Sequence, residues 1–553
     1  MSSPPDSPPR AGLDPSDPYA RTAQTFPVLD DAMAERVASF GTIETVEDGT
    51  FIFERGQRSV DFFLILSGEI EIIDHSGETD SIVHSHRANQ FTGELDLFND
   101  RKILVSGRAI GDTRVVRIKR PDFRRMIAAE PDIGEIIMRA FILRRVALMK
   151  HAQGGVTLVG PAHLSNMVRL ETFLTRNGYP HRTIDTESDA DAAGFLACFN
   201  LTEADLPVVI AEGAPLRNPT NAALADALGL TVQIDCNRVH HLAVIGAGPS
   251  GLAAAVYAAS EGLETVVVEA VAPGGQAGTS SKIENYLGFP TGISGQALAG
   301  RAQVQAQKFG AQLAISRAVA ELDCSERPFR LRLEDGQQLC AEAIVVATGA
   351  RYRKLDLPDY ARFEGNGIHY AATAMEASLC ADTHVVVVGG GNSAGQAAIF
   401  LSRTVAHVHI MVRGEGLAST MSRYLIERIE AADKITLHPF TEISELHGDA
   451  QLREVTWTDR RSGATHRQAV GALFVMIGAE PNTHWLDGCL ELDEKGFVLT
   501  DRNSRLFETS RPGIFAVGDV RSGSIKRVAS GVGEGSVVVS AIHKYLAEIG
   551  AVE

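Results

Sequence analysis

Two hydrophobic patterns divide the chain. Between about residues 28 and 120, apolar and polar positions alternate in short runs such as TFIFE, DFFLILSGEIEIID and TRVVRIK, which Gly- and Asp-containing turns separate. Alternation with a period of two predicts strands with one buried face, and many short strands predict a small β-barrel or jelly roll. The next stretch, PDFRRMIAAEPDIGEIIMRAFILRRVALMK, has helical spacing with a break at Pro131.

The rest of the chain alternates continuous apolar runs with longer helical patterns. From about 154 to 232, three short strand patterns (GVTLVG, HRTIDTE, PVVIAEG) alternate with three helical ones. From 240 to 270, HHLAVIGAGPSGLAAAVYAASEGLETVVVEA predicts a strand, a glycine turn, an Ala-rich helix and a second strand. Strands that alternate with helices are typical of α/β domains with parallel sheets.

The glycine turn of that stretch has the spacing of a dinucleotide-binding motif. Gly246, Gly248 and Gly251 form G-x-G-x-x-G, with Pro249 and Ser250 inside the motif. The first glycine allows the tight turn, the second lets backbone approach a pyrophosphate, and the third lets helix and strand pack closely. Glu269 ends the second strand, where a carboxylate accepts hydrogen bonds from a ribose.

A second stretch, HVVVVGGGNSAGQAAIFLSR, repeats this arrangement. It reads G-x-G-x-x-A, and its members are Gly389, Gly391, Asn392, Ser393 and Ala394. The strand that follows ends at Arg413 instead of an acid. An acid at this place selects the 2′-hydroxyl of NAD, whereas an arginine tolerates the 2′-phosphate of NADP. The sequence therefore predicts two dinucleotide sites, the second for NADPH, with NADH as the alternative.

From residue 238 onward the chain resembles the low-molecular-weight thioredoxin reductases. Further matches are Gly274-Gly275-Gln276, Ile283-Glu284-Asn285-Tyr286, Ala347-Thr348-Gly349 and Gly513-Ile514-Phe515-Ala516-Val517-Gly518-Asp519. The resemblance implies FAD at the first glycine turn, with contacts from Gly275, Gln276, Asn285, Thr348, Gly349, Asp519, Arg527 and Val528. Of the family's H-R-R-x-x-x-R clamp for NADPH only Arg413 remains, and Arg423 is a candidate substitute.

The resemblance fails at the family's redox dithiol. Its C-A-T-C motif corresponds here to Ala371-Ala372-Thr373-Ala374, so both cysteine positions are alanine. Dithiol relay needs a thiolate nucleophile, which alanine cannot supply. We therefore expect an FAD-dependent NAD(P)H oxidoreductase that passes electrons to an unknown acceptor. The alternatives are a ferredoxin- or flavodoxin-NADP reductase-like enzyme, and a flavin or ligand sensor that acts through the N-terminal domain.

The two front domains also carry resemblances. Leu66-Ser67-Gly68-Glu69-Ile70 and Gly93-Glu94-Leu95-Asp96-Leu97-Phe98 are similar to cyclic-nucleotide-binding domains of catabolite-activator-like regulators. That family binds the cyclic phosphate with an arginine about nine residues after G-E-L, where this chain is apolar. The sequence thus favours a structural or dimerisation domain. Residues 154–232 resemble a thioredoxin or glutaredoxin fold without its C-x-x-C, with Leu206-Pro207 at the cis-proline position.

These patterns predict an α/β protein with two Rossmann-like domains behind a jelly roll and a thioredoxin-like domain. The expected boundaries are a disordered Pro-rich tail (1–24), the cyclic-nucleotide-binding-like domain (25–150), the thioredoxin-like domain (154–232), the FAD domain (238–356 and 481–553) and the inserted NAD(P) domain (357–480).

Composition narrows the partners and the compartment. A net charge of −17 argues against binding to nucleic acid or anionic membranes, and no apolar run is long enough to span a bilayer. The six scattered cysteines lack C-x-x-C spacing, which indicates reduced thiols and no zinc or other metal site. Because the sequence has no signal-peptide pattern, we expect a cytoplasmic protein. The resemblance to the reductase family, whose members are generally dimeric, implies a homodimer.

Overall fold

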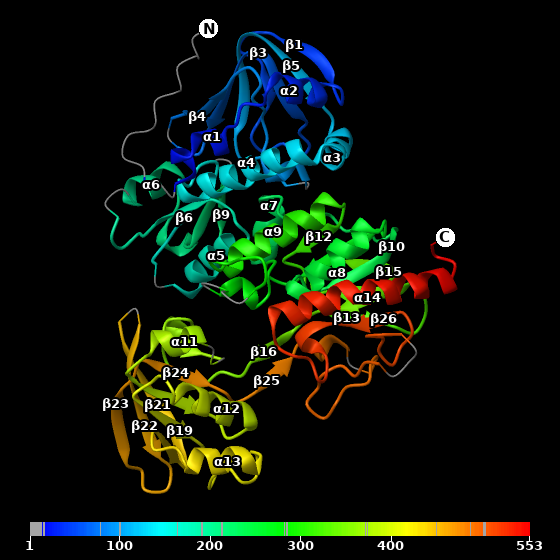
Figure 1. Ribbon diagram of the computed structural model, residues 1–553. Helices are drawn as coiled ribbons and strands as arrows, with labels where there is room; N and C mark the ends of the chain where they lie inside the picture. The colour runs from blue at the N-terminus through cyan, green and yellow to red at the C-terminus, as the bar shows by residue number, and fades with distance from the viewer. Residues whose placement is uncertain are drawn as a thin grey trace.

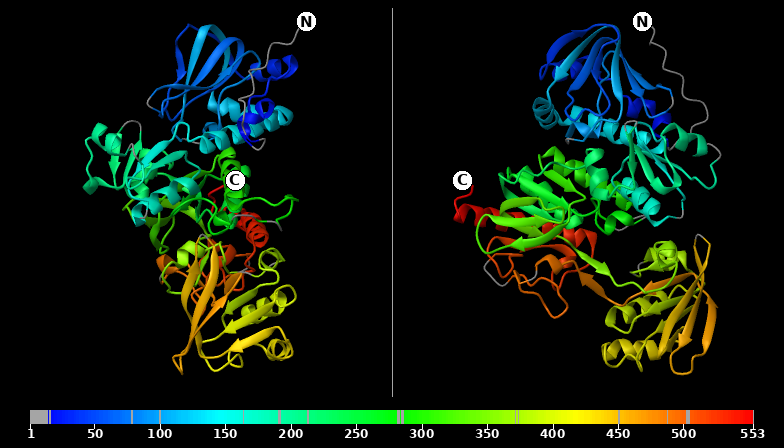
Figure 2. Two further views of the ribbon diagram at one scale, coloured as in Figure 1. Left: turned by 90° about the vertical axis from the view of Figure 1, so that its left-hand side faces the viewer. Right: turned by 180° about the vertical axis from the view of Figure 1, so that it is seen from behind.

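The computed structural model describes Asp14 and residues 17–77, 79–98, 101–162, 164–189, 192–211, 214–280, 283, 286–370, 372, 374–449, 451–486, 488–501 and 505–552. A β-sheet domain lies at one end, with the long helix α4 (Pro131–Lys150) along its base (Figure 1). A small α/β unit and a larger α/β domain follow in the middle, and a further α/β domain lies at the opposite end (Figures 1 and 2). The α/β character and the front β-domain agree with the sequence prediction.

The first domain is a five-stranded antiparallel sheet with the order β1-β5-β3-β4, in which β2 also pairs with β5. The predicted strands and the two helices, with a proline at the start of α4, are present. The elements are α2 (Asp31–Ala38), β1 (Thr42–Val46), β2 (Phe51–Phe53), β3 (Phe62–Asp74), β4 (Ser81–His86), η2 (Leu95–Phe98), β5 (Ser106–Ile118) and α3 (Arg120–Ala129).

The end of the expected Pro-rich tail is ordered, which corrects the tail boundary at residue 24. Residues 17–24 contain η1 (Pro18–Ala20) and most of α1 (Thr22–Thr25). The Tyr19 side chain is buried, stacks on His151 with ring centres 5.0 Å apart, and donates to Gln153. Tyr19 supplies apolar surface that the composition of the segment does not suggest, and α4 offers the partner. Residues 1–13, 15 and 16 lie outside the described residues.

The second unit has a four-stranded sheet with the order β7-β6-β8-β9. Strands β6 and β7 are parallel, while β8 and β9 run antiparallel to β6 and β8 respectively. Six elements follow the predicted strand–helix alternation, and the Leu206-Pro207 bond is cis. The short strand β9 was not predicted. The elements are β6 (Val156–Val159), α5 (Ser165–Arg176), β7 (His181–Ile184), α6 (Ala192–Cys198), η3 (Glu203–Asp205), β8 (Val208–Ala211), β9 (Ala214–Arg217) and α7 (Asn221–Ala227).

The third domain is built on a seven-stranded sheet with the order β12-β11-β10-β15-β14-β13, and β26 pairs with β15. Strands β10, β11, β12, β15 and β26 are parallel, so their carboxyl ends share one edge. The elements are β10 (Val239–Ile245), α8 (Pro249–Ser260), β11 (Thr265–Glu269), η4 (Ala277–Thr279), α9 (Gly295–Lys308), β12 (Gln312–Ile315), β13 (Val319–Asp323), β14 (Phe329–Leu333), β15 (Gln338–Val346), η5 (His484–Leu486), β26 (Ile514–Ala516), η6 (Gly518–Val520) and α14 (Val528–Glu548).

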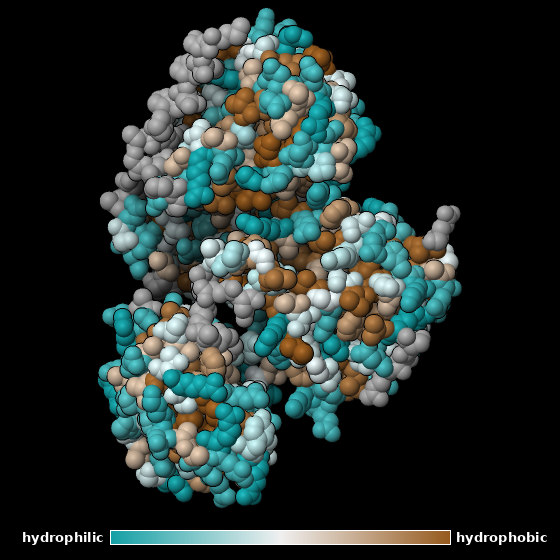
Figure 3. All heavy atoms as spheres, viewed as in Figure 1, coloured by the Kyte–Doolittle hydropathy of each residue, from teal (hydrophilic) through white to brown (hydrophobic). Residues whose placement is uncertain are grey.

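The fourth domain is inserted between β15 and β26 and is joined to the third by a two-stranded ribbon. The ribbon strands are β16 (Ala350–Tyr352) and β25 (Ala479–Pro481). An open gap is visible between this domain and the rest of the molecule in the space-filling view (Figure 3). The parallel sheet of the fourth domain has the order β17-β24-β18-β19-β20. Strands β21, β22 and β23 form a second, antiparallel sheet.

The elements of the fourth domain are α10 (Tyr360–Phe363), β17 (Ile368–His369), α11 (Ala374–Leu379), β18 (His384–Val388), α12 (Asn392–Leu401), β19 (His407–Met411), α13 (Arg423–Glu430), β20 (Ile435–His438), β21 (Thr441–Gly448), β22 (Leu452–Asp459), β23 (Thr465–Ala469) and β24 (Ala472–Val475).

The expectation of uniformly reduced cysteines is wrong for one pair. Cys324 and Cys489 form a disulfide, with Cα atoms 6.2 Å apart and a sequence separation of 165. Cys324 follows β13 and Cys489 follows η5, and both segments pack on the same apolar core. Spacing in the sequence cannot reveal such a pair, because the fold alone brings the two segments together. Cys236, Cys340 and Cys380 are free.

The long helices α4 and α14 do not have the sustained apolar character of membrane spans. No helix within the described part of the chain is long and apolar enough to cross a bilayer.

Candidate active site

The first glycine turn connects β10 to α8 at the carboxyl edge of the third domain's sheet. Gly246 has a φ of +105°, and a β-carbon there would lie 2.4 Å from the carbonyl oxygen of Ala347. A β-carbon on Gly251 would lie only 1.8 Å from the carbonyl oxygen of Gly246. Both positions therefore require glycine, for the tight turn and for close helix packing respectively.

The start of α8 leaves room and hydrogen-bond donors for a phosphate. Gly248 is the N-cap residue and provides no side-chain cap, and Pro249 follows at the first helical position. A β-carbon on Gly248 would meet nothing closer than the Cα of Gly275, at 4.0 Å. The first-turn N–H groups, including that of Ser250, have no side-chain acceptor at the N-cap. These residues fit a dinucleotide pyrophosphate at the helix N-terminus.

Glu269 lies beside this turn at the end of β11. Its carboxylate accepts hydrogen bonds from the backbone N–H groups of Ala247 (2.8 Å), Val271 (2.9 Å) and Ala272 (3.3 Å). Burial raises the pKa of this carboxyl above its usual value, and the backbone donors oppose that shift. The side chain is thus held next to the glycine turn, where it can accept from a ribose hydroxyl.

Two further segments of the site follow β15 and β25. The Gln276 side-chain amide donates to the carbonyl oxygen of Ala350, so this amide ties two loops together. Thr348 donates to the carbonyl oxygen of Asn482 (2.8 Å), and the Asn482 amide donates back to the carbonyl oxygen of Thr348 (2.8 Å). Gly349 follows with a φ of +66°. Asn285 lies outside the described residues.

Asp519 follows β26 and lies in η6, level with the first glycine turn across the sheet edge. Burial raises the pKa of its carboxyl, while the charge of Lys526 acts in the opposite direction. The charge of Asp519 in turn raises the pKa of Tyr352, second to burial, which places these two groups near one another. Arg527 is exposed at the N-cap of α14, and Val528 is the first residue of that helix.

Three residues of α14 were missed by the sequence analysis. A β-carbon on Gly531 would lie 2.4 Å from the Ser250 hydroxyl, and one on Gly535 would lie 2.2 Å from the Ser250 carbonyl oxygen. Glu534 accepts from the backbone N–H of Gly518 (2.6 Å) and pairs with Arg521 (2.9 Å). The G-x-x-x-G spacing of Gly531 and Gly535 is a signal of close helix contact that could have identified this face of α14.

The second glycine turn connects β18 to α12 and resembles the first. Gly389 has a φ of +139°, and a β-carbon there would lie 2.4 Å from the carbonyl oxygen of Met476. Gly391 is the N-cap of α12 without a side-chain cap, and no atom would come within 4 Å of its β-carbon. Ala394 is buried in the helix, and Ser393 lies in its exposed first turn. A second phosphate can approach here.

Asn392 contacts the loop that precedes α13, whereas Arg413 and Arg423 are exposed. The Asn392 side-chain oxygen accepts from the Ser422 N–H at 2.8 Å. Arg413 is exposed two residues after β19. The side chain of Arg423 is 91% exposed and pairs with Glu427 on its own helix at 3.1 Å. Arg423 thus forms an ion pair within α13, and it does not contact Arg413.

One of the two dithiol positions lies at the start of α11. Ala371 is outside the described residues, and Ala374 is the first residue of the helix. Cys380 follows the helix, buried, and its thiol donates to the carbonyl oxygen of Glu376 at 2.9 Å. Burial raises the pKa of this thiol to about 11.

We expect Cys380 to resist alkylation in the folded protein. At pH 8 a thiol with a pKa near 11 is thiolate in roughly one molecule in a thousand, and only the thiolate is nucleophilic. Exposed Cys236 is the internal control and should react with iodoacetamide within the same incubation. Peptide mass spectrometry measures both. Equal labelling of the two thiols would show that Cys380 is accessible and activated.

The disulfide lies away from the first glycine turn. Strand register places Asp323 opposite Arg330, Arg330 opposite Cys340, and Cys340 opposite Val239 at the beginning of β10. The turn follows Ile245, six residues further along β10, which corresponds to roughly 20 Å at about 3.3 Å per residue. The pair Cys324–Cys489 therefore lies toward the end of β10 that is away from the glycine turn.

Comparison with known proteins identifies the class to which this fold and these turns belong. The family model for pyridine nucleotide-disulphide oxidoreductases matches residues 240–535, and the chain belongs to that family. It is an NAD(P)H-dependent flavoprotein oxidoreductase by class. A second family model, the cyclic nucleotide-binding domain, matches residues 43–130.

Within the family the chain is similar to thioredoxin reductases. It is 34% identical to thioredoxin reductase of Neurospora crassa over 315 residues, which covers 55% of this chain and 93% of the relative. It is 32% identical over 348 residues to NADPH-dependent thioredoxin reductase 3 of Arabidopsis thaliana, which covers 60% of this chain and 65% of the relative. Among solved structures, thioredoxin reductase of Streptococcus pyogenes MGAS5005 is 30% identical to this chain, with a TM-score of 0.51. The match covers 56% of this chain and 99% of that structure.

Proposed function

We propose that this protein transfers hydride from NADPH to FAD and passes the electrons to an acceptor other than a dithiol of its own. The observation that carries the proposal is the pair of glycine turns. In each turn the first glycine lies so close to a backbone carbonyl oxygen that a β-carbon would clash with it, and the helix that follows has no side-chain cap at its N-terminus. A flavin supplies hydride-accepting chemistry when bound, and the protein supplies binding and orientation.

The chain's own residues divide this work between two domains. Gly246, Gly248, Gly251 and Glu269 hold FAD, with Gly275, Gln276, Thr348, Gly349, Asp519, Arg527 and Val528 around it; Asn285 completes the set. Gly389, Gly391, Asn392, Ser393 and Ala394 hold NADPH, with Arg413 against the 2′-phosphate. We assign residues 238–356 and 481–553 to the FAD domain, 357–480 to the NADPH domain and 154–232 to a thioredoxin-like domain without a redox pair.

The alanines at 371 and 374 support an external acceptor. No thiol stands at the positions that relay electrons in the dithiol reductases, and neither Cys380 nor the Cys324–Cys489 pair replaces them. Acceptors that take electrons directly from a flavin include quinones, ferredoxin-type proteins and the disulfide of another protein. The two-stranded ribbon between the domains is a narrow connection about which the NADPH domain can reorient.

The test is anaerobic reduction of the purified, FAD-loaded protein. NADPH should bleach the visible flavin absorbance within minutes, and NADH should do so more slowly, because Arg413 pairs with the 2′-phosphate that NADH lacks. Absence of bleaching with both nucleotides would reject the proposal. The variant R413Q should narrow the difference between NADPH and NADH, and R403Q, an exposed arginine after α12, is the matched control.

The acceptor is then identified by adding oxidised thioredoxin, ferredoxin and a quinone to the reduced protein. We expect reoxidation by ferredoxin or the quinone and negligible thioredoxin reduction. Turnover of thioredoxin at the rate of the flavin reduction itself would contradict this expectation and would make the disulfide of another protein the acceptor.

A further inference from the structure

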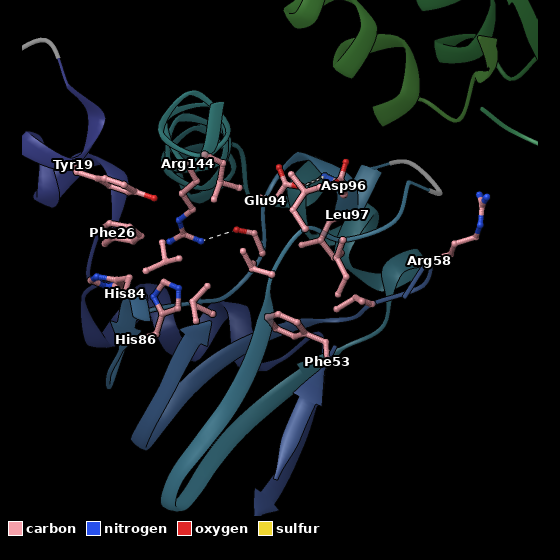
Figure 4. Close-up of a pocket in the computed structure, with 18 residues that line it drawn as sticks. Tyr19, Phe26, Phe53, Arg58, His84, His86, Glu94, Asp96, Leu97 and Arg144 are labelled. Atoms are coloured by element: carbon pink, nitrogen blue, oxygen red, sulfur yellow. Dashed lines mark hydrogen bonds between the residues drawn. The ribbon is translucent and has the colours of Figure 1, made fainter. Parts of the chain in front are cut away.

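The front domain contains a cavity that the oxidoreductase chemistry does not use. The cavity and its open mouth together occupy about 750 Å³ and lie between the sheet, residues 93–97 and 103–105, and α4. Apolar side chains form most of its wall, among them Phe53, Val60, Ile72 and Leu104. Figure 4 shows Arg144 reaching from α4 toward His84 and His86 on β4. A mostly apolar lining with few polar groups is typical of a small-molecule site.

Arg144 is the polar feature that stands out in this wall. The residue is 6% exposed. Its Nε donates to the carbonyl oxygen of Thr25 (2.9 Å), and one terminal nitrogen donates to those of Phe91 (3.2 Å) and Gly93 (2.8 Å). The other terminal nitrogen is buried and has no hydrogen-bond partner among the described residues. Buried donors of a charged group are rarely left unpaired without cost.

No carboxylate in the described part of the chain forms an ion pair with Arg144. Glu94 and Asp96 follow Gly93, one of the residues to which Arg144 donates, but both carboxylates pair with Arg145. Burial lowers the pKa of Arg144 to about 9, and the more distant charge of Glu94 opposes that shift only in part. The rings of Phe26, Phe91 and Phe141 have their centres 4.8–5.8 Å from the Arg144 guanidinium and stabilise its charge. None of them is a counter-ion, so an anionic ligand would add the ion pair that the described residues do not supply.

His86 adds a second polar group beside this guanidinium. The side chain is 2% exposed, and its Nδ1 has no hydrogen-bond partner among the described residues. Burial, and then the charge of Arg144, lower its pKa well below the usual value, so the ring is neutral. A neutral imidazole can donate one hydrogen bond to an anion that Arg144 holds.

A cyclic phosphate does not match this wall. Arg101, the arginine closest to the phosphate-binding position, donates to the carbonyl oxygen of Asn177 in the second unit. The Glu94 carboxylate is held by Arg145 and by the backbone N–H groups of Leu95 and Asp96, so it is not free for a ribose. The wall also includes Arg58 and His84, and Arg144 and His86 each have a buried nitrogen without a hydrogen-bond partner among the described residues, in a mostly apolar chamber.

We propose that this cavity binds a small amphipathic monocarboxylic acid, whose carboxylate pairs with Arg144 and whose aliphatic or aromatic part fills the apolar chamber. The site is independent of the proposed hydride transfer, because binding requires neither nucleotide.

Calorimetric titration of the full-length, FAD-loaded protein tests the proposal with octanoate and 1-naphthylacetate as probes. Their uncharged counterparts are 1-octanol and 2-(1-naphthyl)ethanol, and cyclic AMP represents the nucleotide alternative. At least one acid should bind once per chain and at least about tenfold more tightly than its alcohol, since a desolvated charge pair contributes on the order of a tenfold gain or more. The two acids distinguish an aliphatic from an aromatic ligand.

Two variants and a control sharpen this test. R144Q should abolish the preference for acid over alcohol. R139Q, an exposed arginine of the same helix that pairs with Glu135, should keep it. V60W fills the chamber and leaves Arg144 in place, so it should lose acid and alcohol together even if R144Q fails to fold. Equal binding of acid and alcohol to the unmodified protein, tighter binding of cyclic AMP, no binding of any probe, or unchanged binding to V60W would overturn the proposal.

Discussion

Alanine in place of Gly251 should yield a protein without FAD. The added β-carbon would lie 1.8 Å from the Gly246 carbonyl oxygen, a contact that no β-carbon in a folded protein makes. That oxygen belongs to the turn itself, so relief requires α8 to move away from β10 and the turn to lose its shape. We expect flavin content below roughly a tenth of the unmodified level and a loss of about 1–3 kcal/mol in the free energy of unfolding.

The flavin absorbance per chain after purification measures this effect, together with thermal unfolding. G300A is the matched control, because it places the same β-carbon in α9 where nothing lies within 4 Å. That variant should keep its flavin and gain about 0.5–1 kcal/mol, since alanine loses less backbone entropy than glycine in a helix. A G251A protein with stoichiometric flavin would contradict the assignment of the first turn as the FAD site.

Removal of the Cys324–Cys489 disulfide should destabilise the protein without slowing flavin reduction. The bond spans 165 residues, a segment that includes the whole fourth domain, and closure of so long a loop restricts the unfolded chain strongly. Chain-entropy arguments give about 5 kcal/mol for this length, and natural disulfides contribute about 2–5 kcal/mol. The double variant C324S/C489S should therefore unfold at a clearly lower temperature.

The rate of flavin bleaching by NADPH separates a structural from a redox role for this pair. It should stay unchanged, because strand register places the disulfide at the far end of β10 from the glycine turn. C236S, which removes an exposed free thiol, should change neither stability nor rate. Slower electron transfer to a disulfide acceptor in the double variant, with stability unaffected, would instead make the pair a redox relay.

Local patterns were sufficient for most elements of the fold. The alternation in the front domain and the strand–turn–helix periods later in the chain correspond to observed strands and helices, since both arise from which face of an element is buried. Strand β9 was missed because four residues with a proline carry too little periodicity. The tail boundary was wrong at Tyr19, because a single aromatic residue is buried by a partner, α4, that lies more than a hundred residues away.

The glycines of the candidate site could be predicted because part of their constraint is local. Gly246 and Gly389 have a positive φ within their turns, and Gly251 approaches the carbonyl oxygen of Gly246, although the contacts of Gly246 with Ala347 and of Gly389 with Met476 arise only in the folded chain. Gly531 and Gly535 could not be assigned in the same way, since the atoms they approach belong to Ser250 on another helix. The Arg176 guanidinium donates to the carbonyl oxygen of Gly275 at 3.2 Å, and this contact between the second unit and the third domain likewise exists only in the folded chain.

By itself, the amino-acid sequence determined the two glycine turns between strand and helix, the order of the α/β and β units and the absence of cysteine at 371 and 374, because each depends on residues close together in the chain. Only the tertiary structure decided that Cys324 meets Cys489 and that Arg101 faces the second unit instead of the front-domain cavity. The same holds for Arg144, which enters that cavity without a counter-ion. Pairing and desolvation depend on which distant segments pack together, and no local pattern records that.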